Sequence, residues 1–118
     1  MAAARIDDKA LTEALCALAL DAGAAALRVY QGDFAVDTKT DASPVTEADR
    51  LGEAIILDGL ARLAPDIPTL AEEAASEGNI PALGREFFLV DPLDGTREFV
   101  TRTGEFTVNI ALIRDGRP

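Results

Sequence analysis

The chain has 118 residues, the length of a single domain, and 48% of them are apolar, which is typical of a globular protein with a core. Its formal net charge of −10 argues against binding to nucleic acid polymers or anionic membranes, since both require clusters of Lys and Arg. Histidine is absent, which excludes an imidazole base, a Ser-His or Cys-His nucleophile and any His-containing metal site.

The first predicted element is a long helix over residues 7–31, because apolar residues recur there at steps of three and four. A second apolar stripe predicts that this helix packs on two sides; its members are Cys16, Leu20, Gly23 and Leu27. Cys16 is therefore interpreted as a small buried residue rather than as a reactive thiol. The following segment, 32–45, is polar and contains Gly and Pro, which predicts a loop.

A second helix is predicted over 47–64, where apolar residues again recur at helical spacing and a proline follows. Two short strands are predicted over 67–71 and 86–90, separated by an acidic loop over 72–85. A last strand over 106–113 alternates, and one of its faces carries Phe106, Val108, Ile110 and Leu112. These elements predict an α+β fold, a layered α-β sandwich in which the two helices pair against an antiparallel sheet.

The two ends of the chain carry expectations of their own. The start, MAAARIDD, lacks the apolar segment of a signal peptide, and no run of eighteen apolar residues exists. These features predict a cytoplasmic protein without a transmembrane segment, with a peripheral position at the inner membrane as an alternative. Asp115-Gly116 is typical of a hairpin turn, but no returning strand follows it, so we expect the N-terminal portion of a longer domain.

Carboxylates follow both of the short predicted strands. Asp91 and Asp94 come directly after one strand, in FFLVDPLDGTREF, and Glu72 and Glu73 follow the other. Acidic groups brought together near a core repel one another unless a cation compensates them. Oxygen ligands in a chain without histidine favour Mg²⁺, Mn²⁺ or Ca²⁺. The alternative is that the second strand ends in a turn and its acids are solvated.

Three motifs carry a resemblance to a known family. DPLDGTREF, at 91–99, resembles the D-P-x-D-G-T signature of the inositol monophosphatase superfamily, whose members are lithium-sensitive, Mg²⁺-dependent phosphomonoesterases. AEEA, at 71–74, and SPVTEADR, at 43–50, are similar to two further family motifs and stand in the family's order. The segment at 96–110, TREFVTRTGEFTVNI, is most similar to the CysQ-type 3'(2'),5'-bisphosphate nucleotidases, with Glu98 where inositol monophosphatases usually have asparagine.

The resemblance implies a sugar-phosphatase-like fold and the hydrolysis of 3'-phosphoadenosine 5'-phosphate to AMP and phosphate by metal-activated water. It implies two or more Mg²⁺ ions in a complete site. The implied metal ligands are Glu72, Asp91, Asp94 and the main-chain carbonyl of Leu93; the implied catalytic pair is Asp49 and Thr96; the implied substrate-binding residues are Glu72, Leu93, Asp94, Gly95, Thr96 and Lys39.

Several of these residues also have simpler interpretations. Thr46 and Asp49 fit a helix capping box, in which they satisfy the amides at a helix start. Lys39 is either a solvated loop charge or part of the phosphate site. Arg97 either neutralises the substrate or is exposed, and Glu73 is interpreted as the unused neighbour of the ligand Glu72.

The resemblance corresponds only to the N-terminal half of a family member. In relatives the other half supplies a further metal-ligating aspartate, so we expect the 118 residues alone to fall short of a complete second metal site. The alternatives to the nucleotidase are an inositol monophosphatase-like sugar phosphatase and a non-catalytic fragment that binds a metal or a partner. The expected partner is a small phosphorylated metabolite, and a homo-oligomer is a further expectation.

Overall fold

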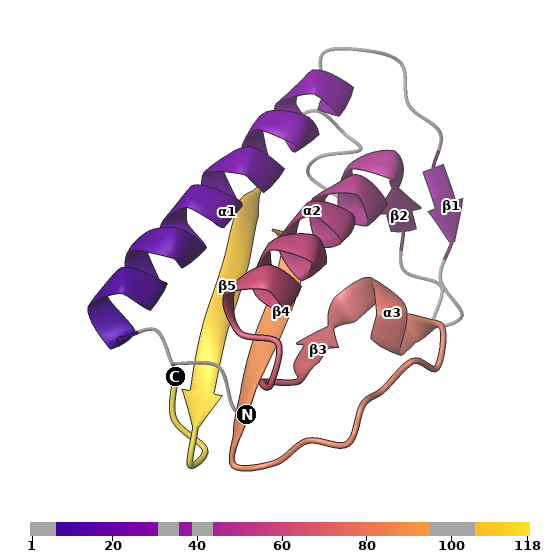
Figure 1. Ribbon diagram of the computed structural model, residues 1–118. Coiled ribbons are helices and arrows are strands. Elements are labelled where there is room, and N and C mark those ends of the chain that lie inside the picture. The colour runs from indigo at the N-terminus through magenta and orange to yellow at the C-terminus, as the bar shows by residue number, and fades with distance from the viewer. Residues whose placement is uncertain (1–6, 31–35, 39–43, 95–105) are drawn as a thin grey trace.

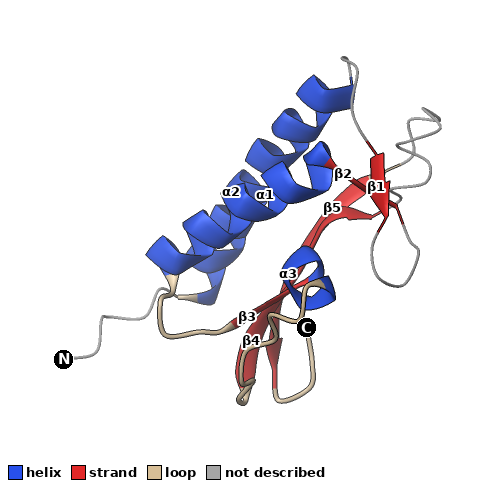
Figure 2. Cartoon of the chain, turned by 90° about the vertical axis from the view of Figure 1, so that its right-hand side faces the viewer, coloured by secondary structure: helices blue, strands red, loops and turns tan. Residues whose placement is uncertain are grey.

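The computed structural model describes residues 7–30, 36–38, 44–94 and 106–118, and only the backbone of 36–38, 44–46 and 94. Its two long helices confirm the periodicity of the sequence. Helix α1 spans Asp8–Tyr30 and α2 spans Glu47–Leu63, within one residue of the predicted limits. Asp7 begins α1 as an N-terminal cap, because its Oδ1 accepts the N–H of Ala10 at 2.9 Å. Figures 1 and 2 both show the two helices lying together on one side of the sheet.

The main sheet has three strands in the order β3-β4-β5. Strand β3 spans Thr69–Ala71, β4 spans Glu86–Asp94 and β5 spans Thr107–Arg114. Strands β4 and β5 are antiparallel, which confirms the antiparallel pairing predicted for 86–90 and 106–113, and β3 lies parallel to β4, so the sheet is mixed. The reason is the long connection after β3, which returns the chain to the end of the sheet where β3 began and so permits parallel pairing.

The core lies between the sheet and the two helices. Phe88 and Val90 of β4 are 0% and 1% exposed, and alternate residues of β5 pack beside them, which confirms the predicted inner face of that strand. Burial of this row makes the helix-facing side of the sheet the main source of apolar stabilisation. The buried members of the cluster are Leu11, Ala22, Ile56, Leu60, Ala71, Phe88 and Val90, and the β5 residues packed on it are Val108, Ile110 and Leu112.

The second apolar stripe of α1 is exposed, so the prediction that this helix packs on two sides is wrong for the described residues. Leu20 and Leu27 are 74% and 50% exposed, and Cys16 is exposed too, which corrects its interpretation as a buried residue. The physical reason is that α1 and α2 lie side by side on one face of the sheet, and the contacts of α1 with α2, β5 and β4 leave the side chains of this stripe uncovered. Its length and apolar composition would by themselves suffice to cross a membrane, but its contacts with α2 and β5 are those of a helix packed in a globular domain.

Short elements occur in two segments that were predicted to be loops. Strands β1, Val36–Thr38, and β2, Pro44–Thr46, form a separate antiparallel pair, and β2 leads directly into α2. Strands of three residues within a polar, Gly- and Pro-containing segment give no usable alternation. Helix α3 spans Glu72–Ser76, within the predicted acidic loop, and its start is stabilised from another part of the chain.

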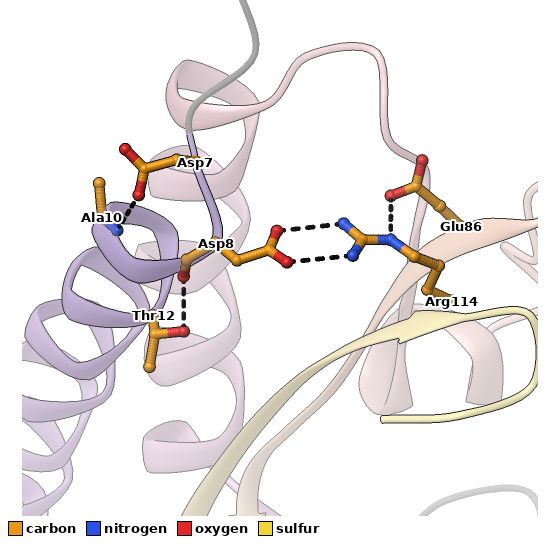
Figure 3. Close-up of polar contacts among 6 residues, drawn as sticks. All are labelled: Asp7, Asp8, Ala10, Thr12, Glu86 and Arg114. Carbon is orange, nitrogen blue, oxygen red and sulfur yellow. Dashed lines mark hydrogen bonds and ion pairs between the residues drawn. The ribbon is translucent and has the colours of Figure 1, made fainter.

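An ion-pair network joins α1 to the sheet at the end opposite the acidic strand ends. The Arg114 guanidinium donates to both carboxylate oxygens of Asp8, at 3.1 and 3.2 Å, and its Nε donates to Glu86 at 3.1 Å (Figure 3). The hydrogen bonds to Asp8 and then to Glu86 raise the pKa of Arg114 above its ordinary value. The network therefore fixes the start of α1 against β4 and β5.

The chain turns directly after β5, as the Asp115-Gly116 pair predicts. Both residues have positive φ, 53° and 78°, and Arg114 and Arg117 bond to each other's main chain across them. Positive φ at both central positions defines the tight turn that joins antiparallel strands. The backbone of β5 is paired with β4 along its length, so its inner edge is satisfied, and among the described strands it forms one edge of the sheet.

Candidate metal centre

Two acidic residues each follow one member of a pair of residues on neighbouring strands. Ala71, the last residue of β3, pairs with Val90 of β4, and the residues that follow them in the sequence are Glu72 and Asp91. Because β3 and β4 are parallel, their carboxyl ends meet at the same edge of the sheet. The expectation that the two predicted strands are neighbours is confirmed, whereas the meeting of their acids at one place stays a prediction.

The sequence predicts that this strand ends at residue 90, with a turn as the alternative for the acids that follow. Strand β4 instead continues past Val90, so Asp91 and Asp94 lie within the strand. The register against β5 shifts between these two residues, Asp94 pairing with Thr107. Proline lacks an N–H and is tolerated in sheets at such irregularities, and Pro92 stands at one, beyond the last pair with β3. The sheet therefore opens where its acids are.

Asp91 and Leu93 are held locally in this opening. Oδ1 of the half-buried Asp91 accepts the main-chain N–H of Leu93 at 3.3 Å, which restrains the carboxylate. The Leu93 side chain is 1% exposed and packs with Ala26 of α1 and Ala48 of α2. A buried side chain anchors the segment, and the group that the resemblance assigns to the metal is the main-chain carbonyl of Leu93.

Helix α2 brings Asp49 to the same region. Asp49 is 0% exposed and adjoins Ala48, which packs on Leu93. Gly52 follows three residues after Asp49 on α2. A Cβ added at Gly52 would lie 3.3 Å from the Cβ of Pro92, so α2 and β4 are in contact there. Helix α2 begins at Glu47, directly after Thr46, as a capping box requires, but the side chain of Thr46 lies outside the described residues.

The two glutamates of AEEA differ in their exposure to solvent. Glu72 is exposed, whereas Glu73 is 5% exposed. A cation with water in its coordination shell needs ligands within reach of solvent, which Glu72 offers. The exposure of the pair agrees with Glu72 as the implied ligand and Glu73 as its neighbour.

The sequence interpretation missed Glu53, which is 7% exposed on α2. Its Oε1 accepts the N–H of Glu73 at 2.8 Å and its Oε2 accepts the N–H of Ala74 at 3.0 Å. Burial raises the pKa of the Glu53 carboxyl, the two N–H donors lower it, and the charges of Glu77 and Glu72 raise it further. The available signal was the spacing of Asp49 and Glu53, two acids four residues apart on the helix face that also carries Ile56.

Only part of the implied metal centre can be placed. Within the parts of the chain that the structure describes, no three His, Cys, Asp or Glu side chains lie close enough to hold an ion. The implied site residues outside that part are Lys39, Gly95, Thr96 and Arg97, together with the side chain of Asp94. The donors that can be placed, the carboxylates of Glu72 and Asp91 and the carbonyl of Leu93, are all oxygens and fit a hard cation such as Mg²⁺.

The layered α-β fold is shared with a family of phosphatases. The model of the inositol monophosphatase family matches residues 7–118, and the chain belongs to this family. The resemblance drawn from the three sequence motifs is thereby confirmed.

The most similar proteins include curated nucleotidases. The chain is 49% identical over 110 residues to the 3'(2'),5'-bisphosphate nucleotidase CysQ of Shigella flexneri, covering 92% of this chain and 45% of that protein. Among solved structures, the extragenic suppressor protein suhB of Bartonella henselae is 33% identical with a TM-score of 0.78, over 91% of this chain and 42% of that one. CysQ of Bacteroides thetaiotaomicron is 35% identical with a TM-score of 0.68, over 92% and 39%. The chain thus spans less than half the length of the relatives it matches.

Proposed function

We propose that the protein carrying this chain is a Mg²⁺-dependent phosphomonoesterase that hydrolyses 3'-phosphoadenosine 5'-phosphate to AMP and phosphate. The observation that carries the proposal is that Glu72 and Asp91 directly follow paired residues of two parallel strands. The α2 segment that bears Asp49 packs on the same part of β4, through Ala48 on Leu93 and Gly52 against Pro92. The 49% identity to a curated 3'(2'),5'-bisphosphate nucleotidase supports the substrate class.

The residues that would hold Mg²⁺ are Glu72, Asp91, Asp94 and the carbonyl of Leu93. Bound there, the ion would act as a Lewis acid, lowering the pKa of a water molecule and offsetting the charge of the phosphoryl group. The chain needs this compensation, because its net charge of −10 repels a phosphate ester.

Among the 118 residues, which include no histidine, we assign a carboxylate to accept the proton of the attacking water. Asp49 is the residue we assign to this step, with the hydroxyl of Thr96 orienting the water. Asp49 is fully buried on α2, which excludes bulk water from its carboxylate. The capping role of Asp49 is compatible with this assignment, because each of its two oxygens can accept a separate hydrogen bond.

Phosphate release from two substrates tests the proposal. The protein as encoded is assayed with 3'-phosphoadenosine 5'-phosphate and with inositol 1-phosphate, in Mg²⁺ and after chelation. We expect turnover that requires Mg²⁺ and a clear preference for the nucleotide. A preference for the inositol ester would replace the nucleotidase with the sugar-phosphatase alternative, and no turnover of either would favour the non-catalytic one.

A further inference from the structure

Helix α3 begins without a cap of its own. Its N-cap residue is Ala71, whose methyl side chain cannot accept a hydrogen bond from the first amides of the helix. The amides of Glu73 and Ala74 instead donate to the two carboxylate oxygens of Glu53, at 2.8 and 3.0 Å. A side chain twenty residues earlier therefore fixes the start of α3.

The residue that provides this cap is attached to the centre of the candidate site. Glu53 lies four residues after Asp49 on α2, so both buried carboxylates project from one face of that helix. Gly52, which lies between Asp49 and Glu53 in the sequence of α2, packs against Pro92 of β4. Helix α2 thus contacts the segment of Asp91 through Gly52 and the segment of Glu72 through Glu53.

Capping this helix with a carboxylate costs free energy, because a charge is buried near other acids. Glu53 is buried, and it lies near the like charges of Glu77 and Glu72. A neutral Ser or Thr at position 71 would satisfy an amide of the first turn without burying a charge. What such a local cap would not do is join α3 to α2.

Resting on the function proposed above, we infer that Glu53 is a positioning residue for the metal ligand Glu72. Its carboxylate, held by α2, clamps the main chain one and two residues after Glu72 and so fixes that ligand relative to Asp49 and Asp91. Without Glu53 the first turn of α3 loses both acceptors, and Glu72 loses its fixed position. Asp91 keeps its own restraint, because its contacts with Leu93 do not involve α3.

The test combines a Mg²⁺ titration by calorimetry with hydrogen exchange of the protein as encoded. Glu53→Gln keeps the size of the side chain but leaves only one oxygen to accept the two amides. We expect it to weaken Mg²⁺ binding about tenfold, as loss of a residue that orients a metal ligand typically does. The amides of Glu73 and Ala74 should exchange faster than in the parent. Turnover of the variant should be lower than that of the parent at limiting Mg²⁺, and excess Mg²⁺ should restore much of it.

Three further variants make the outcomes separable. Asp58→Asn removes an exposed acid from the same helix, where it pairs with Arg62, and should leave Mg²⁺ binding unchanged. Glu72→Gln should abolish the binding that Glu53→Gln weakens. If Glu53→Gln does not fold, Glu53→Asp, which keeps the charge but shortens the reach, carries the same expectation.

If Glu72→Gln abolishes Mg²⁺ binding while the Glu53 variant binds as tightly as Asp58→Asn, the positioning role is overturned and the metal centre stands. If Glu72→Gln binds Mg²⁺ as tightly as the parent, the metal centre is overturned, and the positioning role with it.

Discussion

Substituting Gly52 by alanine tests whether α2 sets the position of the acidic segment of β4. The added Cβ would lie 3.3 Å from the Cβ of Pro92, 3.6 Å from its carbonyl oxygen and 3.8 Å from the Cβ of Ala22. Carbon atoms prefer separations of roughly 3.5–4.0 Å, so Pro92 must move by a few tenths of an ångström. The clash opposes the gain of about 1 kcal/mol that alanine brings to a helix interior.

We therefore expect Gly52→Ala to leave the free energy of unfolding within about 1 kcal/mol of the parent. Turnover of 3'-phosphoadenosine 5'-phosphate should fall roughly tenfold, since sub-ångström displacement of a catalytic segment is costly to rate. Gly23→Ala is the matched control: it is also helical, and nothing lies within 4 Å of its added Cβ. It should gain stability of about 1 kcal/mol with unchanged turnover.

Urea unfolding gives the free energy of unfolding and phosphate release gives the turnover, each measured on the parent and both variants. If Gly52→Ala gains as much stability as Gly23→Ala and keeps full turnover, the contact between α2 and Pro92 does not set the geometry of Asp91.

Three further expectations follow from named residues. Asp91→Asn should reduce turnover more than roughly a thousandfold, about 4 kcal/mol of transition-state stabilisation, with an unchanged circular dichroism spectrum; near-parental activity would remove Asp91 from the metal centre. Phe88→Ala should lower the free energy of unfolding by about 3–5 kcal/mol in urea, because this side chain is fully buried, and a loss under about 1 kcal/mol would contradict its place in the core. The raised pKa of Glu53 means that the folded state holds this proton more tightly than the unfolded state; its stabilising contribution is full below the ordinary value of 4.5 and is lost as pH rises through the folded value. Glu53→Gln should remove that loss, so the stability of the variant relative to the parent should rise over this pH range in urea titrations, and a constant difference would argue against the shift.

Much of the fold could be predicted, because its long elements carry strong local patterns. The apolar residues of α1 and α2 recur over several turns, and the β4 and β5 runs are apolar enough to identify as strands. The exposure of Cys16 could not be predicted in the same way. A periodic pattern shows which residues of a helix share a face, but not whether anything covers that face.

The candidate site shows a similar division. Glu72 and Asp91 were predicted as site residues from the order of three motifs, and the parallel pairing of Ala71 with Val90 shows that each directly follows a member of one strand pair. Glu53 was missed because its role is a contact with the main chain of α3, twenty residues away, and no local pattern records such a contact. Two acids in one apolar helix stripe were the only sign of it.

The most direct test of the central claim is the location of a bound cation. Crystals of the protein as encoded, grown with Mn²⁺ in place of Mg²⁺, would show the ion by anomalous scattering. We expect a peak at about 2.0–2.3 Å from carboxylate oxygens of Glu72 and Asp91, the range of divalent cation–oxygen bonds. A peak elsewhere with neither residue as a ligand, or no peak at this edge of the sheet, would contradict the assignment of these strand ends as a metal centre.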